Sequence, residues 1–248
     1  GAWTELKYPT TLANTLIYTI GNTLFQVFIC SMVGYGFARF RFRGKNVLFA
    51  LLIFTIIVPV QTYMIPLYVE FKNFDYFGIG SLIGLFTGKT LQTSLVNSNL
   101  PFYIMAALGA GIRSGLYIFM LRQFFTGVPD ALEESAYIDG SGVFRTFFTI
   151  ILPLSIPMMV TVFLFSFCWQ WMDDFYTELF FTTSKITLMP DVVEVPTSLK
   201  TDYAGQNMYY AAIRNTCGLC IIAPLVILYC FGQNFLVQGI ERSGLTAE

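Results

Sequence analysis

Five long apolar runs constrain this chain more than any other feature of its sequence. Each approaches or exceeds the roughly 20 helical residues that cross the hydrocarbon core of a bilayer. Inside lipid a backbone must satisfy its own polar groups, which a helix does. The sequence therefore predicts an all-α, polytopic membrane helix bundle with five visible spans, the second of them broken by Pro59 and Pro66. The runs cover 11–38, 47–69, 101–121, 150–171 and 208–231.

The composition indicates that lipid rather than water surrounds most of the chain. Charged residues make up 12% of the sequence and hydrophobic residues 55%, whereas charged residues approach about a quarter of an ordinary soluble domain. The net charge of −1 gives no indication of nucleic-acid binding, and the absence of histidine removes the usual general base and metal ligand. All five cysteines lie in apolar runs, which favours simple packing, including for the pair Cys217 and Cys220. We expect no metal site and no catalytic residues.

The basic residues indicate which side of the membrane each loop occupies, because Lys and Arg favour cytoplasmic loops. Alternating the five spans places one arginine-rich group on a single side, whereas the lysines of the opposite loops are diluted by acids. The loop at 129–153 and the C-terminus are then cytoplasmic, and the N-terminus is outside. A chain that begins outside without a signal sequence is unusual. We therefore expect a sixth, N-terminal span that this sequence lacks. The arginine-rich group comprises Arg39, Arg41, Arg43, Lys45, Arg122, Arg145 and Arg242.

A polar island at 133–153 separates two of the apolar runs. Pro129 and Asp130 favour a helix start, and the acids that follow suit the positive end of a helix dipole. Gly140 is typical of a helix end that needs a left-handed residue. A second helix is expected to bring Phe144, Phe147, Phe148 and Ile151 onto one apolar face. A short acidic helix held outside the bilayer by two spans is more often a docking element than a catalytic one.

The spacing within this island is specific. It reads Glu134-Ser135-Ala136, three residues, Gly140, nine residues, Ile150, one residue, Leu152-Pro153. This pattern resembles the cytoplasmic EAA loop of bacterial ABC-importer permeases, and residues 12–245 resemble the maltose-permease G-type subunit of carbohydrate importers. Ser135 stands where that family usually has alanine, a substitution of one small residue for another. The resemblance implies a type I ABC-importer permease fold, with 1–248 as a single transmembrane domain and 129–153 as its coupling-helix loop.

The resemblance also implies a function. The chain would be a non-catalytic subunit of the bacterial inner or plasma membrane that forms half of the translocation path for a sugar or oligosaccharide. Its partners would be a second, different permease, a dimer of ABC ATPases that holds the ATP and Mg²⁺, and an extracellular or periplasmic sugar-binding protein. This chain itself would need no cofactor and would bind no nucleic acid. The residues expected to couple to the ATPase are Glu133, Glu134, Ser135, Ala136, Asp139, Gly140, Leu152 and Pro153.

Two places are candidates for the substrate path. Arg113 lies within an apolar run, where an ionisable group is costly and often functional; the alternative is a structural anchor to a neighbouring helix, made close by Gly111 and Gly115. The second place is an aromatic and acidic cluster at the outer end of the fourth run, which suits sugar recognition or, alternatively, an interfacial aromatic belt. The candidates in this cluster are Trp169, Trp171, Asp173 and Asp174.

Two other classes of membrane protein fit the sequence less well. An ion-coupled secondary carrier or a channel tends to show internal repeats or acids within its spans, and neither is visible. A membrane enzyme is disfavoured by the lack of histidine and of clustered intramembrane acids. The segment from Gly84 to Thr90 resembles a phosphate-binding loop but has three residues between its glycines, where that motif needs four. Any ATP site must therefore belong to a partner.

Overall fold

The computed structural model describes residues 7–88, 91–183 and 206–244. Within these ranges every regular element is a helix, apart from an isolated antiparallel bridge between Phe74 and Thr93. The all-helical fold class is thus confirmed. Residues 184–205, between the fourth and fifth apolar runs, lie outside the described residues, as do Lys89 and Thr90 at the end of the segment that resembles a phosphate-binding loop. The chain divides into two compact units, and four helices contribute residues to both: α2 (Tyr8–Arg39), α6 (Leu100–Ala107), α11 (Ile156–Trp171) and α13 (Gln206–Gly244).

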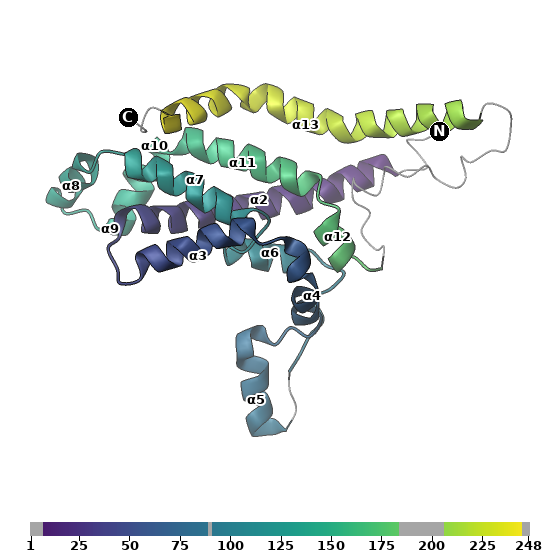
Figure 1. Ribbon diagram of the computed structural model, residues 1–248, viewed down its shortest axis with the longest axis horizontal. Helices are drawn as coiled ribbons and strands as arrows, with labels where there is room; N and C mark the ends of the chain where they lie inside the picture. Colours follow the sequence, from purple (N-terminus) through teal and green to yellow (C-terminus); the bar gives the residue numbers. More distant parts are fainter. Residues whose placement is uncertain (1–6, 89–90, 184–205, 245–248) are drawn as a thin grey trace. The chain divides into compact units, whose positions relative to one another are not determined.

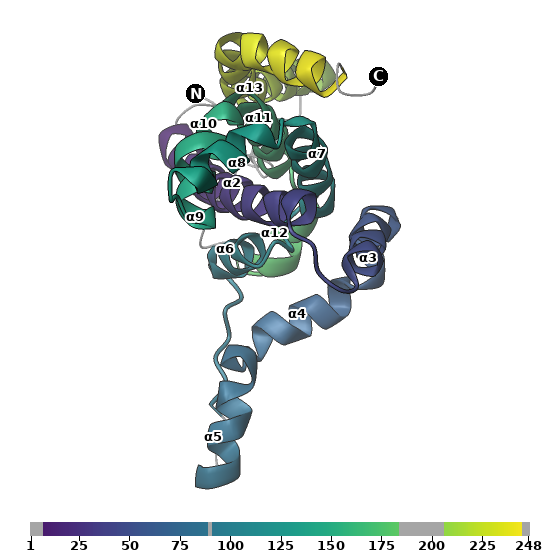
Figure 2. The same cartoon turned by 90° about the vertical axis from the view of Figure 1, so that its left-hand side faces the viewer.

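The first unit comprises 1–22, 58–105 and 170–222. It contains the start of α2, which spans Tyr8–Arg39, and the start of α13, which spans Gln206–Gly244. Phe102, Phe180 and Phe71 form its aromatic core, with ring centroids 5.3 to 5.4 Å apart. In both ribbon views α5 extends beyond α4, away from α6 and α12 (Figures 1 and 2). Its shorter elements are η1 (Val60–Thr62), α4 (Met64–Lys72), η2 (Tyr76–Gly78), α5 (Ile79–Thr87), α6 (Leu100–Ala107) and α12 (Phe175–Phe180).

The second unit comprises 23–57, 106–169 and 223–248, and it holds the polar island. Its longer helices run in nearly the same direction in Figure 1. A continuous buried core of apolar side chains joins α2, α7 and α11, with Cys30, Leu121 and Val162 fully buried. Its elements, besides parts of α2 and α13, are α3 (Lys45–Ile57), α7 (Ser114–Gly127), α8 (Ala131–Ile138), α9 (Val143–Thr146), the π-helical turn η3 (Phe147–Ile151), α10 (Leu152–Leu154) and α11 (Ile156–Trp171).

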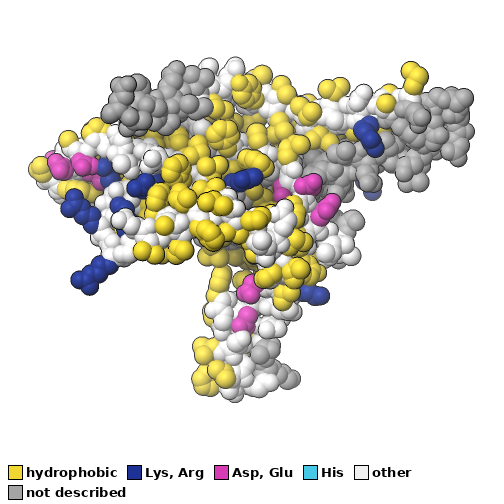
Figure 3. Space-filling model, in the orientation of Figure 1, with side chains coloured by type: hydrophobic (Ala, Val, Ile, Leu, Met, Phe, Trp, Pro, Cys, Tyr) yellow, Lys and Arg dark blue, Asp and Glu magenta, His cyan; other side chains and the backbone are white. Residues whose placement is uncertain are grey.

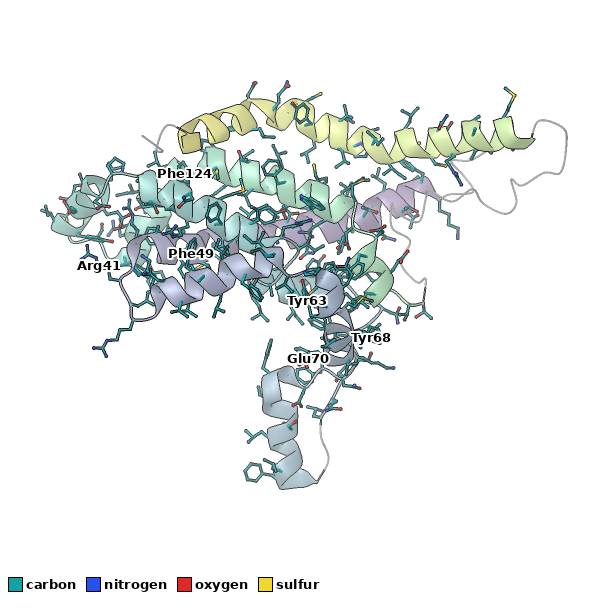
Figure 4. The ribbon with its side chains drawn as sticks, viewed as in Figure 1. Arg41, Phe49, Tyr63, Tyr68, Glu70 and Phe124 are labelled. Carbon is teal, nitrogen blue, oxygen red and sulfur yellow. The ribbon has the colours of Figure 1, made fainter. Side chains whose placement is uncertain are left out.

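Small residues let the helices of this unit approach closely, as is common in membrane helix pairs. A β-carbon on Gly34 of α2 would lie 3.0 Å from Leu121 Cβ of α7, and one on Gly115 of α7 would lie 2.6 Å from Thr55 Oγ1 of α3. Phe49 of α3 points toward α7 (Figure 4), where the Arg122 guanidinium lies 4.1 Å from its ring. A β-carbon on Gly111 would lie 3.1 Å from Gln26 Nε2 of α2, so Gly111 and Gly115 both lie where segments of this unit approach closely.

The five expected spans differ in how continuous their helices are in the structure. Within the described residues, two helices are long and apolar enough to cross a membrane, Tyr8–Arg39 and the stretch Ala211–Leu236 of α13. A third span forms if Val143–Leu154 and Ile156–Trp171, which meet at 75°, are counted together. The other two expected spans are broken into shorter helices, at Pro59 and at the residues before Arg113. Proline cannot donate its backbone hydrogen bond, so a helix is readily interrupted there.

Candidate functional site

The helix of the polar island begins after Asp130 and ends before Gly140, as the sequence predicts. Helix α8 has acids in its first turn and Asp130 at its N-cap. Gly140 has a φ of 80° and lies just past the helix end. There the Ser141 N–H donates to the Ala136 carbonyl at 2.9 Å, which closes the last turn. The result is a helix of about two turns that is held between α7 and α9.

The two acids of the first turn of α8 differ in exposure, one being buried and the other open to solvent. Glu134 is exposed, together with Ser135 and Asp139, and Ile138 at the last turn is 86% exposed. Glu133 and Ala136 are buried against the rest of the second unit. The sequence grouped Glu133 with Glu134 as a docking acid, and the structure separates them because positions i and i+1 of a helix lie about 100° apart.

Glu133 is the centre of a buried polar cluster. Its carboxylate lies 2.7 Å from Nε of Arg39, close enough for an ion pair although off the line of an N–H hydrogen bond. Its other oxygen accepts hydrogen bonds from the hydroxyls of Tyr35 at 3.1 Å and Tyr137 at 3.3 Å. The guanidinium of Arg39 also contacts the Asp130 carboxylate and donates to the Val128 carbonyl. The charge pattern alone indicates for Arg39 a role in membrane topology and does not identify these contacts.

The chain after Gly140 departs from the expected single apolar face. Phe147 and Ile151 are buried, but Phe144 is 71% exposed and Phe148 is 43% exposed. The cause is the π-helical turn η3 after α9, which adds a residue to the turn and rotates the positions on either side of it. Leu152 and Pro153 then lie in α10, where Leu152 is half-buried and Pro153 exposed, and the chain bends by 75° into α11.

The break in the third apolar run is held by Gln26 of α2. Arg113 itself adopts a left-handed conformation, with φ 61° and ψ 16°, immediately before α7. The Gln26 side-chain amide donates to the Ile112 carbonyl at 2.6 Å and to Ser114 Oγ at 2.8 Å, and it accepts from the Ser166 hydroxyl at 2.6 Å. These contacts satisfy backbone and side-chain polar groups where the helix is interrupted inside an apolar region.

Arg113 and Trp169 lie against each other on the surface of the second unit. The guanidinium carbon is 4.3 Å from the indole ring centre, within the range of a cation–π contact, and both side chains are exposed. In the described parts of the chain no carboxylate lies within ion-pair distance of Arg113. Among the described residues, the contact that Arg113 makes with a neighbouring helix is therefore the one with Trp169 of α11 rather than an ion pair with an acid.

The remaining residues of the aromatic and acidic cluster belong to the first unit. Trp171 is fully buried, and its indole N–H donates to the Ile221 carbonyl at 3.1 Å, which is a packing role. The Asp173 carboxylate accepts from the backbone N–H groups of Tyr176 and Thr177 at the start of α12. Asp174 is exposed. The residues expected to form one cluster therefore divide between the two units: Trp169 is an exposed residue of the second, whereas the other three belong to the first.

Asp173 is expected to make the stability of the first unit depend on pH. Burial raises the pKa of its carboxyl from 3.8 to about 6, opposed by the two N–H donors and assisted by Asp174. Because the pKa is raised, the folded state holds this proton more tightly than the unfolded state. The contribution of Asp173 to stability therefore falls as pH rises from about 4 to about 6, by at most about 3 kcal/mol.

Melting temperatures of the detergent-purified chain at pH 4.5 and 6.5 measure this effect. In Asp173→Asn the difference between the two temperatures should shift in favour of pH 6.5 relative to the parent chain. Glu178→Gln, which changes an exposed acid of the same helix, is the matched control. An unaltered difference in Asp173→Asn would contradict the raised pKa.

Basic side chains gather, next to the acids of α8, at the end of the second unit that carries α8 and the loop between α2 and α3 (Figure 3). Arg41 of that loop lies at this end in Figure 4. Apolar side chains cover much of the flank of the same unit in the view of Figure 3. An apolar flank beside a basic end is the arrangement that the positive-inside rule predicts for a membrane protein.

Comparison with known proteins agrees with this arrangement. The family model of the binding-protein-dependent transport system inner membrane component matches residues 28–242. An ABC transporter permease protein of Pyrococcus horikoshii is 30% identical over 92% of this chain and 72% of its own length. The arabinooligosaccharides transport system permease protein AraQ of Bacillus subtilis is 27% identical over 94% of this chain and 72% of its own.

A solved structure shares the fold. The crystal structure of a bacterial ABC transporter that imports the acidic polysaccharide alginate contains a chain with a TM-score of 0.67 and 20% sequence identity, covering 94% of this chain and 78% of that one. With its apolar helices and basic end, the second unit has the features of a multi-pass membrane permease. The chain belongs to the binding-protein-dependent transport system inner membrane component family. It is a non-catalytic permease subunit of an ABC importer, which implies ATPase and binding-protein partners.

Proposed function

We propose that this permease subunit forms half of the translocation path for a sugar or oligosaccharide, and that α8 is its contact with the ATPase. The observation that carries the proposal is the exposed face of α8, where Glu134, Ser135 and Ile138 are open to a partner while the opposite face is buried. An exposed isoleucine beside acids on a two-turn helix suits insertion into a cleft with a basic rim. The carbohydrate class is supported by relatives that carry arabinooligosaccharides and alginate.

The proposed assembly has four kinds of component. This chain acts as a single transmembrane domain over 1–248, beside a second and different permease. Two ABC ATPases, which hold the ATP and Mg²⁺, lie on the cytoplasmic side with the loop 129–153 and the C-terminus. A sugar-binding protein delivers the substrate from the outside. In this proposal the nucleotide sites belong to the ATPases, and the energy of ATP reaches this chain through protein contacts.

The proposed mechanism begins with closure of the ATPases on ATP, which displaces α8. Ser135 and Ala136 allow close approach because they are small, and Glu134 pairs with basic residues of the cleft. Asp139 and Gly140 form the turn at the end of α8, and Leu152 and Pro153 lead from the loop into the bent span α10–α11. Displacement of α8 tilts the attached helices and opens the path toward the binding protein.

Arg113 and Trp169 are the proposed path residues of this chain. An exposed guanidinium in an apolar region is costly in lipid, which favours a position toward the path or toward the second permease. Trp169 offers an aromatic face to the C–H surface of a sugar, while Arg113 donates hydrogen bonds to its hydroxyls. Trp171 is less suited because it is fully buried, and Asp173 and Asp174 belong to the start of α12.

The proposal is tested by purifying the permease with its native partners and reconstituting the complex in liposomes. ATP hydrolysis is measured with the binding protein loaded with each sugar of a panel, together with uptake of the same sugar. One sugar or a small group should stimulate hydrolysis and enter the vesicles only with ATP. Uptake by this chain alone without ATP would instead support a secondary carrier or a channel.

A further inference from the structure

The Arg39 side chain contacts three residues around the start of α8. Its guanidinium contacts the carbonyl of Val128 before the helix, the carboxylate of Asp130 at the N-cap and the carboxylate of Glu133 in the first turn. The Arg39 side chain is only 13% exposed and that of Glu133 only 9%. These contacts join the beginning of α8 to the last turn of α2.

The other end of α8 has no comparable attachment among the described residues. Gly140 has no heavy atom within 4 Å of the place where a β-carbon would lie, and the same is true of Gly142. Gly140 also adopts the left-handed conformation that other residues avoid. We therefore expect a displacement of α8 to reach α2 through the start of α8, where the Arg39 contacts lie.

Aromatic rings pack around the contact between Arg39 and Glu133, which we call the joint between α2 and α8. Tyr35, which donates to Glu133 from one turn earlier in α2, is 4% exposed. Its ring centre lies 4.7 Å from that of Phe147 and 5.8 Å from that of Phe125. The polar cluster is thus fixed on one side by α7 and η3 and cannot shift without repacking the core.

Helix α2 then leads from this joint to the break beside Arg113. Gln26 lies about 20 Å along the axis from Arg39, at 1.5 Å per residue, with no interruption of the helix between them. Gln26 is the residue that holds Ile112, Ser114 and Ser166. One rigid helix therefore connects α8 with the neighbourhood of Arg113 and Trp169.

We propose that Arg39 and Glu133 are positioning residues that make α2 move with α8, so that the motion of the ATPase reaches the Arg113 break through α2. This inference rests on the proposed role of α8 as the ATPase contact. It gives Glu133 a different role from Glu134: Glu133 fastens the helix to its own chain, and Glu134 faces the partner. Tyr35 supports Glu133 from the same helix as Arg39.

The test uses the complete reconstituted complex and three readouts: co-purification of the ATPase, stimulation of hydrolysis by the loaded binding protein, and uptake. Arg39→Gln and Glu133→Gln should retain the ATPase but lose stimulation and uptake by on the order of tenfold. Arg39→Lys, which keeps the charge but not all three contacts, should be intermediate. Arg41→Gln removes an exposed arginine two residues away and should behave like the parent chain.

The outcomes separate this inference from the proposed function. If the parent chain does not co-purify with the ATPase, the proposed role of α8 fails. If the parent complex works and both glutamine variants stimulate and transport normally, only the joint is refuted. Loss of the ATPase from both variants would also refute it, since Arg39 and Glu133 would then serve docking. If Arg39→Gln folds poorly, Glu133→Gln carries the test, because it is isosteric and keeps an acceptor for both tyrosines.

Discussion

Replacing Gly140 with aspartate is expected to leave the permease inserted and folded but to abolish transport. Gly140 has open space around it, so the new side chain meets no atom of its own chain. The left-handed backbone, with φ 80°, costs a non-glycine residue about 1–2 kcal/mol, less for aspartate than for most. The added carboxylate would lie at the negative end of α8, on the face proposed to meet the ATPase.

The expected result is a loss of ATPase association of about a hundredfold, or ~2.7 kcal/mol. It is measured by co-purification of the ATPase with a tagged permease and by uptake in vesicles, with the amount of permease in the membrane as the reference. Gly140→Asn controls for backbone strain, because asparagine tolerates the left-handed region without the charge. Gly142→Asp adds the same charge at an ordinary φ of −78°, also in open space.

These controls define what would contradict the assignment. Gly140→Asn should retain most of the association and Gly142→Asp an intermediate amount. If Gly140→Asp co-purifies with the ATPase and imports normally, α8 is not the coupling helix. If Gly140→Asn fails as badly as Gly140→Asp, strain rather than contact with the partner explains the loss.

The position and the ends of α8 were predictable from the sequence because they depend on local chemistry. Acids in a first turn and a glycine at the helix end act through the backbone of the same few residues. The burial of the Glu133 side chain against α2 was not predictable in this way. Its partner Tyr35 lies 98 positions earlier in the chain, and nothing in the spacing of the polar island identifies that contact.

The apolar runs predicted the fold class but only part of the span pattern. The break near Pro59 was visible because proline removes a hydrogen-bond donor. The break before Arg113 was not, because glycine and alanine are common within membrane helices and give no definite stop. A signal for it existed at a distance: Gln26 is an amide in the middle of an apolar run, and a buried amide needs partners such as the free carbonyl of an interrupted helix.

Replacing Gln26 with leucine is expected to destabilise the second unit strongly. Gln26 is fully buried, and its amide has three partners on two other segments. Leucine has a similar volume, so the loss is mainly one of hydrogen bonding. Interhelical hydrogen bonds in membranes contribute about 0.6 kcal/mol on average and up to about 1.7. Three of them predict a loss of about 2–5 kcal/mol, measured as a lower melting temperature and a lower yield in detergent.

The comparison with Ser31→Ala and Arg113→Ala distinguishes the possible roles of this cluster. Ser31 is equally buried on the same helix, but in the described part of the chain its hydroxyl donates to the Val27 carbonyl within α2 and to no other segment, so its loss should cost little stability. Arg113→Ala should leave stability near that of the parent chain and reduce uptake, since its side chain is exposed and contacts Trp169 rather than the core. If Gln26→Leu has the same melting temperature as Ser31→Ala, the break before α7 is maintained by its own glycines rather than by α2. The rigid connection from α8 to Arg113 would then end short of the proposed path.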